Sequence, residues 1–194
     1  MGTIVATEFV SLDGVFEDPG GAEGTRHGGW TFAFDRGADG NQFKIDELEE
    51  AEVQLLGRGT YEGFAAAWPK MNEDPFGQKM NAMPKYVVSR TLTSAEWTNS
   101  TILAGDLAQE VGELRREVEG VILIAGSGQL VRGLLELGLV DELRLMVFPV
   151  VLGSGRRLFG EADEKLTLTL ASARVVGDGV VILTYRAAGA PGDG

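Results

Sequence analysis

The stretch LIAGSGQL, residues 123–130, joins an apolar run to a helix-like pattern across two glycines. A strand-to-helix turn of this kind leaves backbone N–H groups at the positive end of the helix dipole, which favours phosphate binding. Gly126, Gly128 and Gly133 do not have the spacing of a Rossmann fingerprint, and no G-K-[ST] follows as in a Walker A loop. Two interpretations stay open: a phosphate site, or a glycine turn that only allows close helix packing.

Two further strand ends carry side chains that could hold a phosphate. In GRGTYEGF, residues 57–64, a buried strand ends at Gly57, Arg58 brings a fixed positive charge, and Thr60 is placed to cap the next helix. Ser89 and Arg90 follow the apolar segment KYVV. Open α/β sheets bind ligands at the carboxyl ends of their strands. Three such strand ends in one chain therefore indicate a ligand site more specifically than any one of them does. Taken singly, each is also explained by a capped helix or a solvated arginine.

Composition excludes several kinds of site. The chain has 194 residues with 44% hydrophobic and 24% charged side chains, as in a globular protein. It has no cysteine and only one histidine, His27, so we expect no disulfide, no thiolate or histidine metal site and no Ser-His-Asp triad. A net charge of −12 disfavours nucleic acid and membrane surfaces as partners. The first residues lack an export signal, so we expect a cytoplasmic protein.

The order of elements predicts one α/β domain over residues 1–188, followed by a flexible tail, 189–194. Strands are expected at 3–10, 53–57, 85–89, 100–105, 121–125, 143–151, 166–176 and 179–187, the last two joined by a GDG hairpin. Helices are expected at 41–52, 60–68, from Asp106 to 118, and from Ser127 to the cap residue Gly138. Residues 20–40 are expected to form a long mobile loop, and 69–84 a second loop. Alternating strands and helices before an antiparallel end predict a mixed, mostly parallel sheet with helices on both faces.

Six motifs, in order, carry a resemblance to a known family. They are SLDG at 11–14, GRGTYE at 57–62, VVSRTL at 87–92, GSGQL at 126–130, GLVDELRL at 138–145 and PVVLGSGRRLF at 149–159. Together they resemble the dihydrofolate-reductase-like superfamily, and within it the reductase domain of bifunctional riboflavin-biosynthesis deaminase/reductases, as a stand-alone member. The similarity spans about residues 3–186 and implies a three-layer α/β/α fold with a C-terminal antiparallel hairpin. The deaminase half has no counterpart in this sequence.

The resemblance also implies a cofactor, NADPH, and places residues around it. Arg58 and Thr60 match the segment that meets the cofactor phosphates, and Ser89 and Arg90 match the segment near the 2′-phosphate. The glycine turn matches the one under the pyrophosphate, and Gly14 of SLDG also belongs to the expected cofactor set. The residues of the turn are Gly126, Ser127, Gly128, Gln129 and Leu130. Two arginines beside a phosphoribose favour NADPH over NADH, because the additional phosphate is doubly charged.

A reductase also needs a proton source and a closed substrate site. Asp13 of SLDG is the candidate acid, although an Asp-Gly turn in which Asp13 bonds its own backbone explains it as well. His27 could touch substrate from the loop or be solvated. Arg156 and Arg157 could hold a substrate phosphate, cap a helix or lie in water. Trp30, Phe32 and Phe34 are candidate walls for a flat heterocycle, or residues that pack the loop on the core.

The expected activity is therefore an NADPH-dependent reduction of a small heterocycle, with a ribosylaminopyrimidine of riboflavin biosynthesis as the implied substrate and a homodimer as the implied assembly. Two alternatives stay open. One is a nucleotide-binding module without turnover. The other is a dihydrofolate reductase, for which Asp35, Asp39 and Asp46 are possible acids in and before the first helix.

Overall fold

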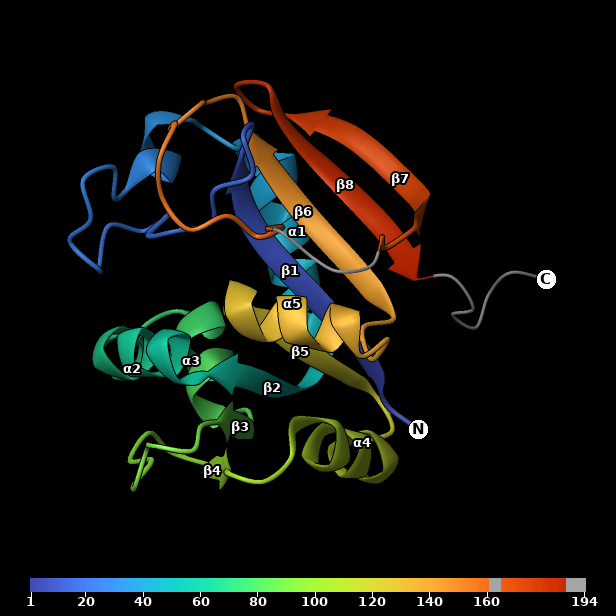
Figure 1. Ribbon diagram of the computed structural model, residues 1–194. Helices are drawn as coiled ribbons and strands as arrows, with labels where there is room; N and C mark the ends of the chain where they lie inside the picture. Colours follow the sequence, from blue (N-terminus) through green and yellow to red (C-terminus); the bar gives the residue numbers. More distant parts are fainter. Residues whose placement is uncertain (161–164, 188–194) are drawn as a thin grey trace.

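The computed structural model describes residues 1–160 and 165–187, so the predicted tail at 189–194 lies outside the described residues. Its strands form one sheet of eight in the order β4-β3-β2-β5-β1-β6-β8-β7 (Figure 1). The strands are β1 (Thr3–Ser11), β2 (Ala51–Gly57), β3 (Lys85–Val88), β4 (Ser100–Leu103), β5 (Val121–Ala125), β6 (Glu142–Phe148), β7 (Leu168–Val176) and β8 (Val180–Ala187). The helices are η1 (Trp30–Ala33), α1 (Gly37–Glu50), α2 (Arg58–Ala67), η2 (Trp68–Lys70), α3 (Pro75–Ala82), α4 (Leu107–Glu117) and α5 (Gly128–Glu136).

The sheet is mostly parallel, as predicted. Six neighbouring strands of the sheet, β4, β3, β2, β5, β1 and β6, pair in parallel. By contrast, β8 is antiparallel to β6, and β7 is antiparallel to β8. Gly177 and Gly179, both with positive φ, turn the chain from β7 into β8, which confirms the predicted hairpin. Parallel pairing brings the carboxyl ends of six strands to one edge of the sheet.

Helices cover both faces, so the molecule has three layers. In Figure 1, α5 lies in front of the sheet and α1 behind it. The alternation of side chains along β1 follows from this arrangement: Ile4 and Ala6 pack in a core with α4 and α5, whereas Val5 packs with Leu48 of α1. The middle three residues of β5 are buried, which explains the uninterrupted apolar run VILIA.

One helix was not predicted, and the first helix begins earlier than predicted. The segment 69–84, expected as a loop, contains α3, which begins at Pro75 with the Asp74 carboxylate accepting from the Gly77 N–H at 3.0 Å. The polar, glycine-containing sequence hid this helix, but its Asp-Pro start is a recognised signal. The first helix begins at Gly37, inside the expected loop, and ends at Glu50, because Ala51 already belongs to β2.

The glycine-rich segment before α1 is organised around a buried carboxylate. Asp18 has a left-handed backbone (φ 48°), and its side chain is 2% exposed. It accepts from the backbone N–H groups of Glu23 and Thr25 and from the Thr25 hydroxyl at 2.9–3.0 Å. These bonds favour the ionised form and hold the pKa of Asp18 below its usual value despite burial. The expected long loop is thus folded around an internal anchor.

Candidate functional site

The three strand ends singled out in the sequence lie side by side at the carboxyl edge. Gly57, the last residue of β2, pairs with Val88, the last residue of β3, so Arg58 and Ser89 each follow directly on neighbouring strands. On the other side of β2, the Gly57 N–H donates to the Ser127 hydroxyl at 2.9 Å. This bond joins the turn before α2 to the turn before α5, and the three turns follow neighbouring strands in the order β3-β2-β5.

The turn between β5 and α5 has a backbone suited to close approach. Gly126 and Ser127 both lie in the left-handed region, with φ of 69° and 65°. A Cβ on Gly126 would lie 3.4 Å from the Thr60 Cγ2 atom. The first α5 hydrogen bond runs from the Val131 N–H, which donates to the Ser127 carbonyl at 3.0 Å. The preceding three amides, at 128–130, are therefore the open donors of the helix end.

The side chains within this turn contribute little to its open face. Leu130 is 8% exposed and packs in the core, so its side chain is not available to a ligand. Gln129 is exposed at the first turn of α5. Gly128 packs against the ring of Phe16, where a Cβ would come within 2.9 Å of three ring carbons, so this glycine is required by helix packing. The packing interpretation thus holds at Gly128, and the phosphate site at Gly126 stays a prediction.

Thr60 does not cap α2, which corrects one sequence prediction. The helix begins at Arg58 with Gly57 as the N-cap residue, and no side chain makes the capping bond. Thr60 lies inside the first turn, with its methyl group toward Gly126. The Arg58 side chain is 55% exposed, and its nearest carboxylate, Glu62, is 3.9 Å away. A surface pair at this distance contributes little, so the guanidinium can turn to another anion.

The two residues after β3 have different roles. The Ser89 hydroxyl accepts from the N–H groups of Thr91 and Leu92 at 3.2 and 2.9 Å, and Ser89 is 7% exposed. Its side chain therefore closes its own turn. Arg90 is exposed beside it.

Asp13 is held by a ring of donors at the end of β1. Its carboxylate accepts from the Ser11 hydroxyl at 2.7 Å, from the Leu152 and Gly153 N–H groups at 3.0 and 2.9 Å, and forms an ion pair with Arg157 at 3.3 Å. The Ser11 hydroxyl, with the two amides, lowers the pKa of Asp13 far below its usual value. A carboxyl group in this state is an ionised acceptor at neutral pH. These contacts favour the Asp-Gly turn over the acid role.

Gly14 and the two arginines of GSGRR complete the same structure. Gly14 (φ 79°) follows Asp13, and its carbonyl accepts from the Leu158 N–H at 2.9 Å. The Arg157 guanidinium also donates to the Asp13 carbonyl at 3.0 Å. Arg156 forms ion pairs with Glu17, at 2.8 Å, and with Glu23. Both arginines thus tie the connection after β6 to the loop after β1.

The aromatic residues of the loop are divided between core and surface. Trp30 is 7% exposed, its indole N–H donates to the Glu17 carbonyl at 2.8 Å, and its ring meets Phe148 edge-on at 5.4 Å. Phe34 is half-buried and lies 6.0 Å from the same ring. Phe32 is 80% exposed. His27 is half-buried in the same loop.

The acidic residue that α1 buries at the sheet was not among the sequence candidates. Asp35, Asp39 and Asp46 are exposed. Glu47, by contrast, is 1% exposed, lies 2.5 Å from the Lys44 ammonium and accepts from the Thr7 hydroxyl at 3.2 Å. Its burial could have been predicted from its position in the sequence, because Glu47 falls four residues after Phe43 on the apolar side of the helix.

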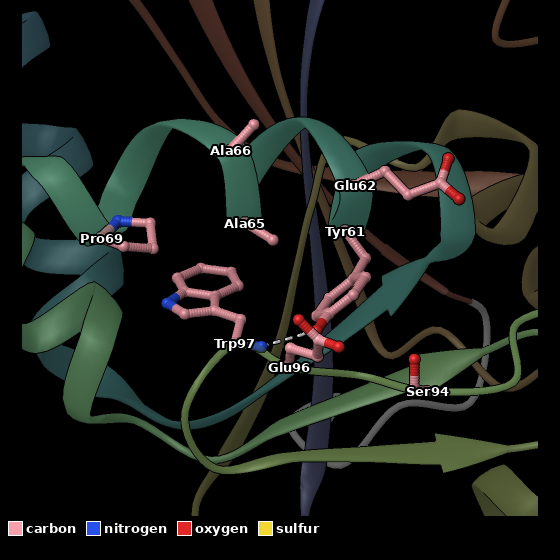
Figure 2. Close-up of a pocket in the computed structure, with 8 residues that line it drawn as sticks. All are labelled: Tyr61, Glu62, Ala65, Ala66, Pro69, Ser94, Glu96 and Trp97. Carbon is pink, nitrogen blue, oxygen red and sulfur yellow. Dashed lines mark hydrogen bonds between the residues drawn. The ribbon is translucent and has the colours of Figure 1, made fainter.

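A hollow of about 430 Å³ lies between α2 and the segment after β3, and no residue of the glycine turn lines it (Figure 2). Tyr61 and Trp97 form its floor, and the backbone N–H of Trp97 donates to the Tyr61 hydroxyl at 3.0 Å. This contact holds the 92–97 segment on α2. In the described residues, no helix is both long and apolar enough to span a bilayer.

Solved structures with the same arrangement define the class of fold. A putative riboflavin biosynthesis protein from Shewanella sp. PV-4 superposes with a TM-score of 0.76 at 22% identity, covering 95% of this chain and 98% of its own. Dihydrofolate reductase from Enterococcus faecalis, complexed with NADP(H), superposes with a TM-score of 0.57 at 18% identity, covering 96% and 97%. The chain has the dihydrofolate-reductase-like fold that the sequence predicted.

Sequence comparison gives the family. The family model "RibD C-terminal domain" matches residues 2–182, and the chain belongs to this family. Among curated relatives, the uncharacterized protein YyaP of Bacillus subtilis (strain 168) is 33% identical over 147 residues, which are 73% of this chain and 77% of YyaP. Membership supports a reductase-like oxidoreductase.

Proposed function

We propose that this protein is an NADPH-dependent reductase that passes a hydride to a small heterocyclic substrate, with a ribosylaminopyrimidine as the first candidate. The observation that supports it most strongly is the adjacency of three turns at the carboxyl edge, where the Gly57–Ser127 bond links two turns and Arg58 and Arg90 follow neighbouring strands. The fold and the family support the same conclusion.

The residues present fit a dinucleotide. Because Gly126 has no Cβ, there is space beside Thr60 that a side chain would narrow. The backbone amides at 128–130 would supply donors for a pyrophosphate. Arg58 and Arg90 would hold the 2′-phosphate, and Gly14 would lie at the nicotinamide end. When bound, the cofactor supplies the hydride. The chain's own part is to orient it along the edge from β3 to β1 and to exclude water.

Asp13 enters this proposal as a positioning residue. Its four donors fix the connection after β6 against the end of β1, beside the expected substrate site. A proton for the substrate then has to come from a group other than this ionised carboxylate.

The assembly proposed is a homodimer formed by the face of β7 and β8 on the α5 side. Leu170 and Val175 are 52% and 70% exposed there, next to half-buried Leu183 and Tyr185. Figure 1 shows no helix in front of these two strands. An apolar surface of this kind on an acidic chain is typical of a contact with a second copy.

Turnover tests the proposed function directly. Loss of NADPH absorbance at 340 nm is followed with pyrimidine, pterin and quinone acceptors, for the wild type, for Arg58→Ala and Arg90→Ala, and for Arg116→Ala on α4 as a control. We expect turnover with a pyrimidine, and a KM for NADPH raised tenfold or more in the first two variants only. Binding of NADPH without turnover of any acceptor would favour the nucleotide-binding module instead.

A further inference from the structure

Lys85, the first residue of β3, is a fully buried lysine. It is 0% exposed, and within residues 1–160 and 165–187 it forms no ion pair within 4.0 Å. A lysine is almost never fully buried unless it is paired. Burial lowers the pKa of Lys85 from 10.5 to about 8, so the charged form still predominates at neutral pH. The chain therefore keeps an ammonium group in its interior at a cost in stability.

The Lys85 ammonium holds the chain around Trp97. It donates to the Asn81 carbonyl at 2.6 Å and to the Thr98 carbonyl at 3.0 Å. The centroid of the Trp97 ring lies 4.1 Å from the same nitrogen, which is the geometry of a cation–π contact. Lys85 thus contacts both the Trp97 ring and the backbone of the residue that follows it.

Two further bonds fix Trp97 in the same place. Its backbone N–H donates to the Tyr61 hydroxyl at 3.0 Å, the dashed line in Figure 2. Its indole N–H donates to the side-chain carbonyl of Asn81 at 2.7 Å, and the Asn81 amide donates to the Trp68 carbonyl at 2.9 Å. We call Lys85, Asn81, Tyr61 and Trp97 the Trp97 anchor. It attaches the chain at Trp97 to α2 and α3.

The segment 89–97 carries Arg90 between two fixed points. At its start the Ser89 hydroxyl closes the turn, and at its end lies the Trp97 anchor. Residues 91–96 belong to no helix or strand. Among the residues that the structure describes, Arg90 forms no ion pair within 4.0 Å. The place of the Arg90 guanidinium therefore depends on the backbone of this segment.

We propose that Lys85 is a positioning residue for the 2′-phosphate of NADPH, acting through Trp97 on the segment that carries Arg90. This inference rests on the proposed function, which places Arg90 beside that phosphate. A segment fixed at both ends loses less conformational freedom when Arg90 meets the phosphate, so the gain in affinity applies to NADPH and not to NADH. Methionine at position 85 would be cheaper to bury, but it would release Trp97 and Thr98.

Cofactor affinity tests the role of Lys85. NADPH and NADH are titrated by calorimetry into the wild type, into Lys85→Met and into Lys70→Met, a control at an exposed lysine of η2. We expect Lys85→Met to weaken NADPH binding about fivefold or more and to leave NADH binding unchanged, and Lys70→Met to change neither. Trp97→Phe, which removes the indole N–H, should act in the same direction and serves as the second variant if Lys85→Met does not fold.

A double variant tests whether Lys85 acts through Arg90. When Arg90 is already replaced by alanine, Lys85→Met should cause no further loss of NADPH affinity, because the side chain that Lys85 positions is gone. The same loss of NADPH affinity in the Arg90→Ala background as in the wild type would overturn the inference.

Hydrogen–deuterium exchange gives a measurement that needs no cofactor. The backbone amides of 91–97 should exchange about tenfold faster or more in Lys85→Met, and those of β5 should be unchanged. Unchanged exchange at 91–97, or an NADPH preference that folded Lys85→Met keeps, would overturn only this inference. Equal affinities of the wild type for NADPH and NADH would contradict the proposed function itself.

Discussion

Glu8, at the centre of β1, is a carboxyl group in an apolar environment. It pairs in register with Leu145, which in turn pairs with Leu183, and it is 3% exposed with no hydrogen bond to its Oε1 atom among the described residues. Burial raises the pKa of Glu8 from 4.5 to about 8, although the positive charge of Lys44 opposes this. At neutral pH the protonated form of Glu8 therefore predominates in the folded protein.

The raised pKa predicts a pH-dependent stability. A raised folded-state pKa means that the contribution of Glu8 is fully present below pH 4.5 and is lost as the pH rises through about 8. Relative to Glu8→Gln, which does not titrate, wild-type unfolding free energy should fall by up to about 1.4 kcal/mol per pH unit across this range. Urea unfolding at pH 5, 7 and 9 measures the difference. Parallel curves for the two proteins would contradict the burial of an ionisable Glu8.

The contacts of Asp13 predict a structural loss. Asp13→Ala leaves two backbone N–H groups without their acceptor and removes the carboxylate partner of Arg157, and it should destabilise the protein by about 1–3 kcal/mol. The measurement is urea unfolding at pH 7, with exposed Asp39→Ala as the control. Wild-type stability in Asp13→Ala would mean that the connection after β6 is held by other contacts.

Among the helices and strands, most strands could be predicted from the sequence. The prediction failed for features that depend on contacts between elements far apart in the chain. The strand VILIA matched β5 because continuous burial gives an unambiguous pattern, and Asp106 caps α4 as expected, accepting from the Gln109 N–H at 3.1 Å. The α3 helix was missed because its short polar sequence has weak periodicity. The buried Lys44–Glu47 pair was missed because a charged pair on a helix is normally solvated, and only the neighbouring strand shows otherwise.

Two glycines at opposite ends of α5 provide a matched test of the turn. Gly126 and Gly138 both have a left-handed backbone, with φ of 69° and 66°, so alanine at either position costs about 1–2 kcal/mol. A Cβ on Gly126 meets Thr60, whereas one on Gly138 meets nothing within 4 Å. We expect Gly126→Ala to weaken NADPH binding tenfold or more and Gly138→Ala to leave it unchanged, by tryptophan quenching. If the two substitutions weakened NADPH binding equally, backbone strain alone would explain the loss of affinity.

At the scale of the whole molecule, the exposed face of β7 and β8 predicts the assembly. Val175→Lys and Leu170→Lys place charges on this face and should convert a dimer to a monomer without unfolding it. Light scattering after size exclusion measures the mass, and Leu137→Lys, at an exposed position after α5, is the control. A wild-type mass equal to the chain's 20.7 kDa would contradict the homodimer.

We propose that two arginines beside neighbouring strand ends select a dinucleotide with a 2′-phosphate. The most direct measurement is the ratio of NADH to NADPH dissociation constants, by tryptophan quenching, in the wild type and in the Arg58→Ala/Arg90→Ala double variant. We predict that NADPH binds at least a hundredfold more tightly to the wild type, and that the ratio falls close to one in the double variant because only NADPH loses affinity. Equal wild-type affinities, or a ratio that the double variant keeps, would contradict the claim.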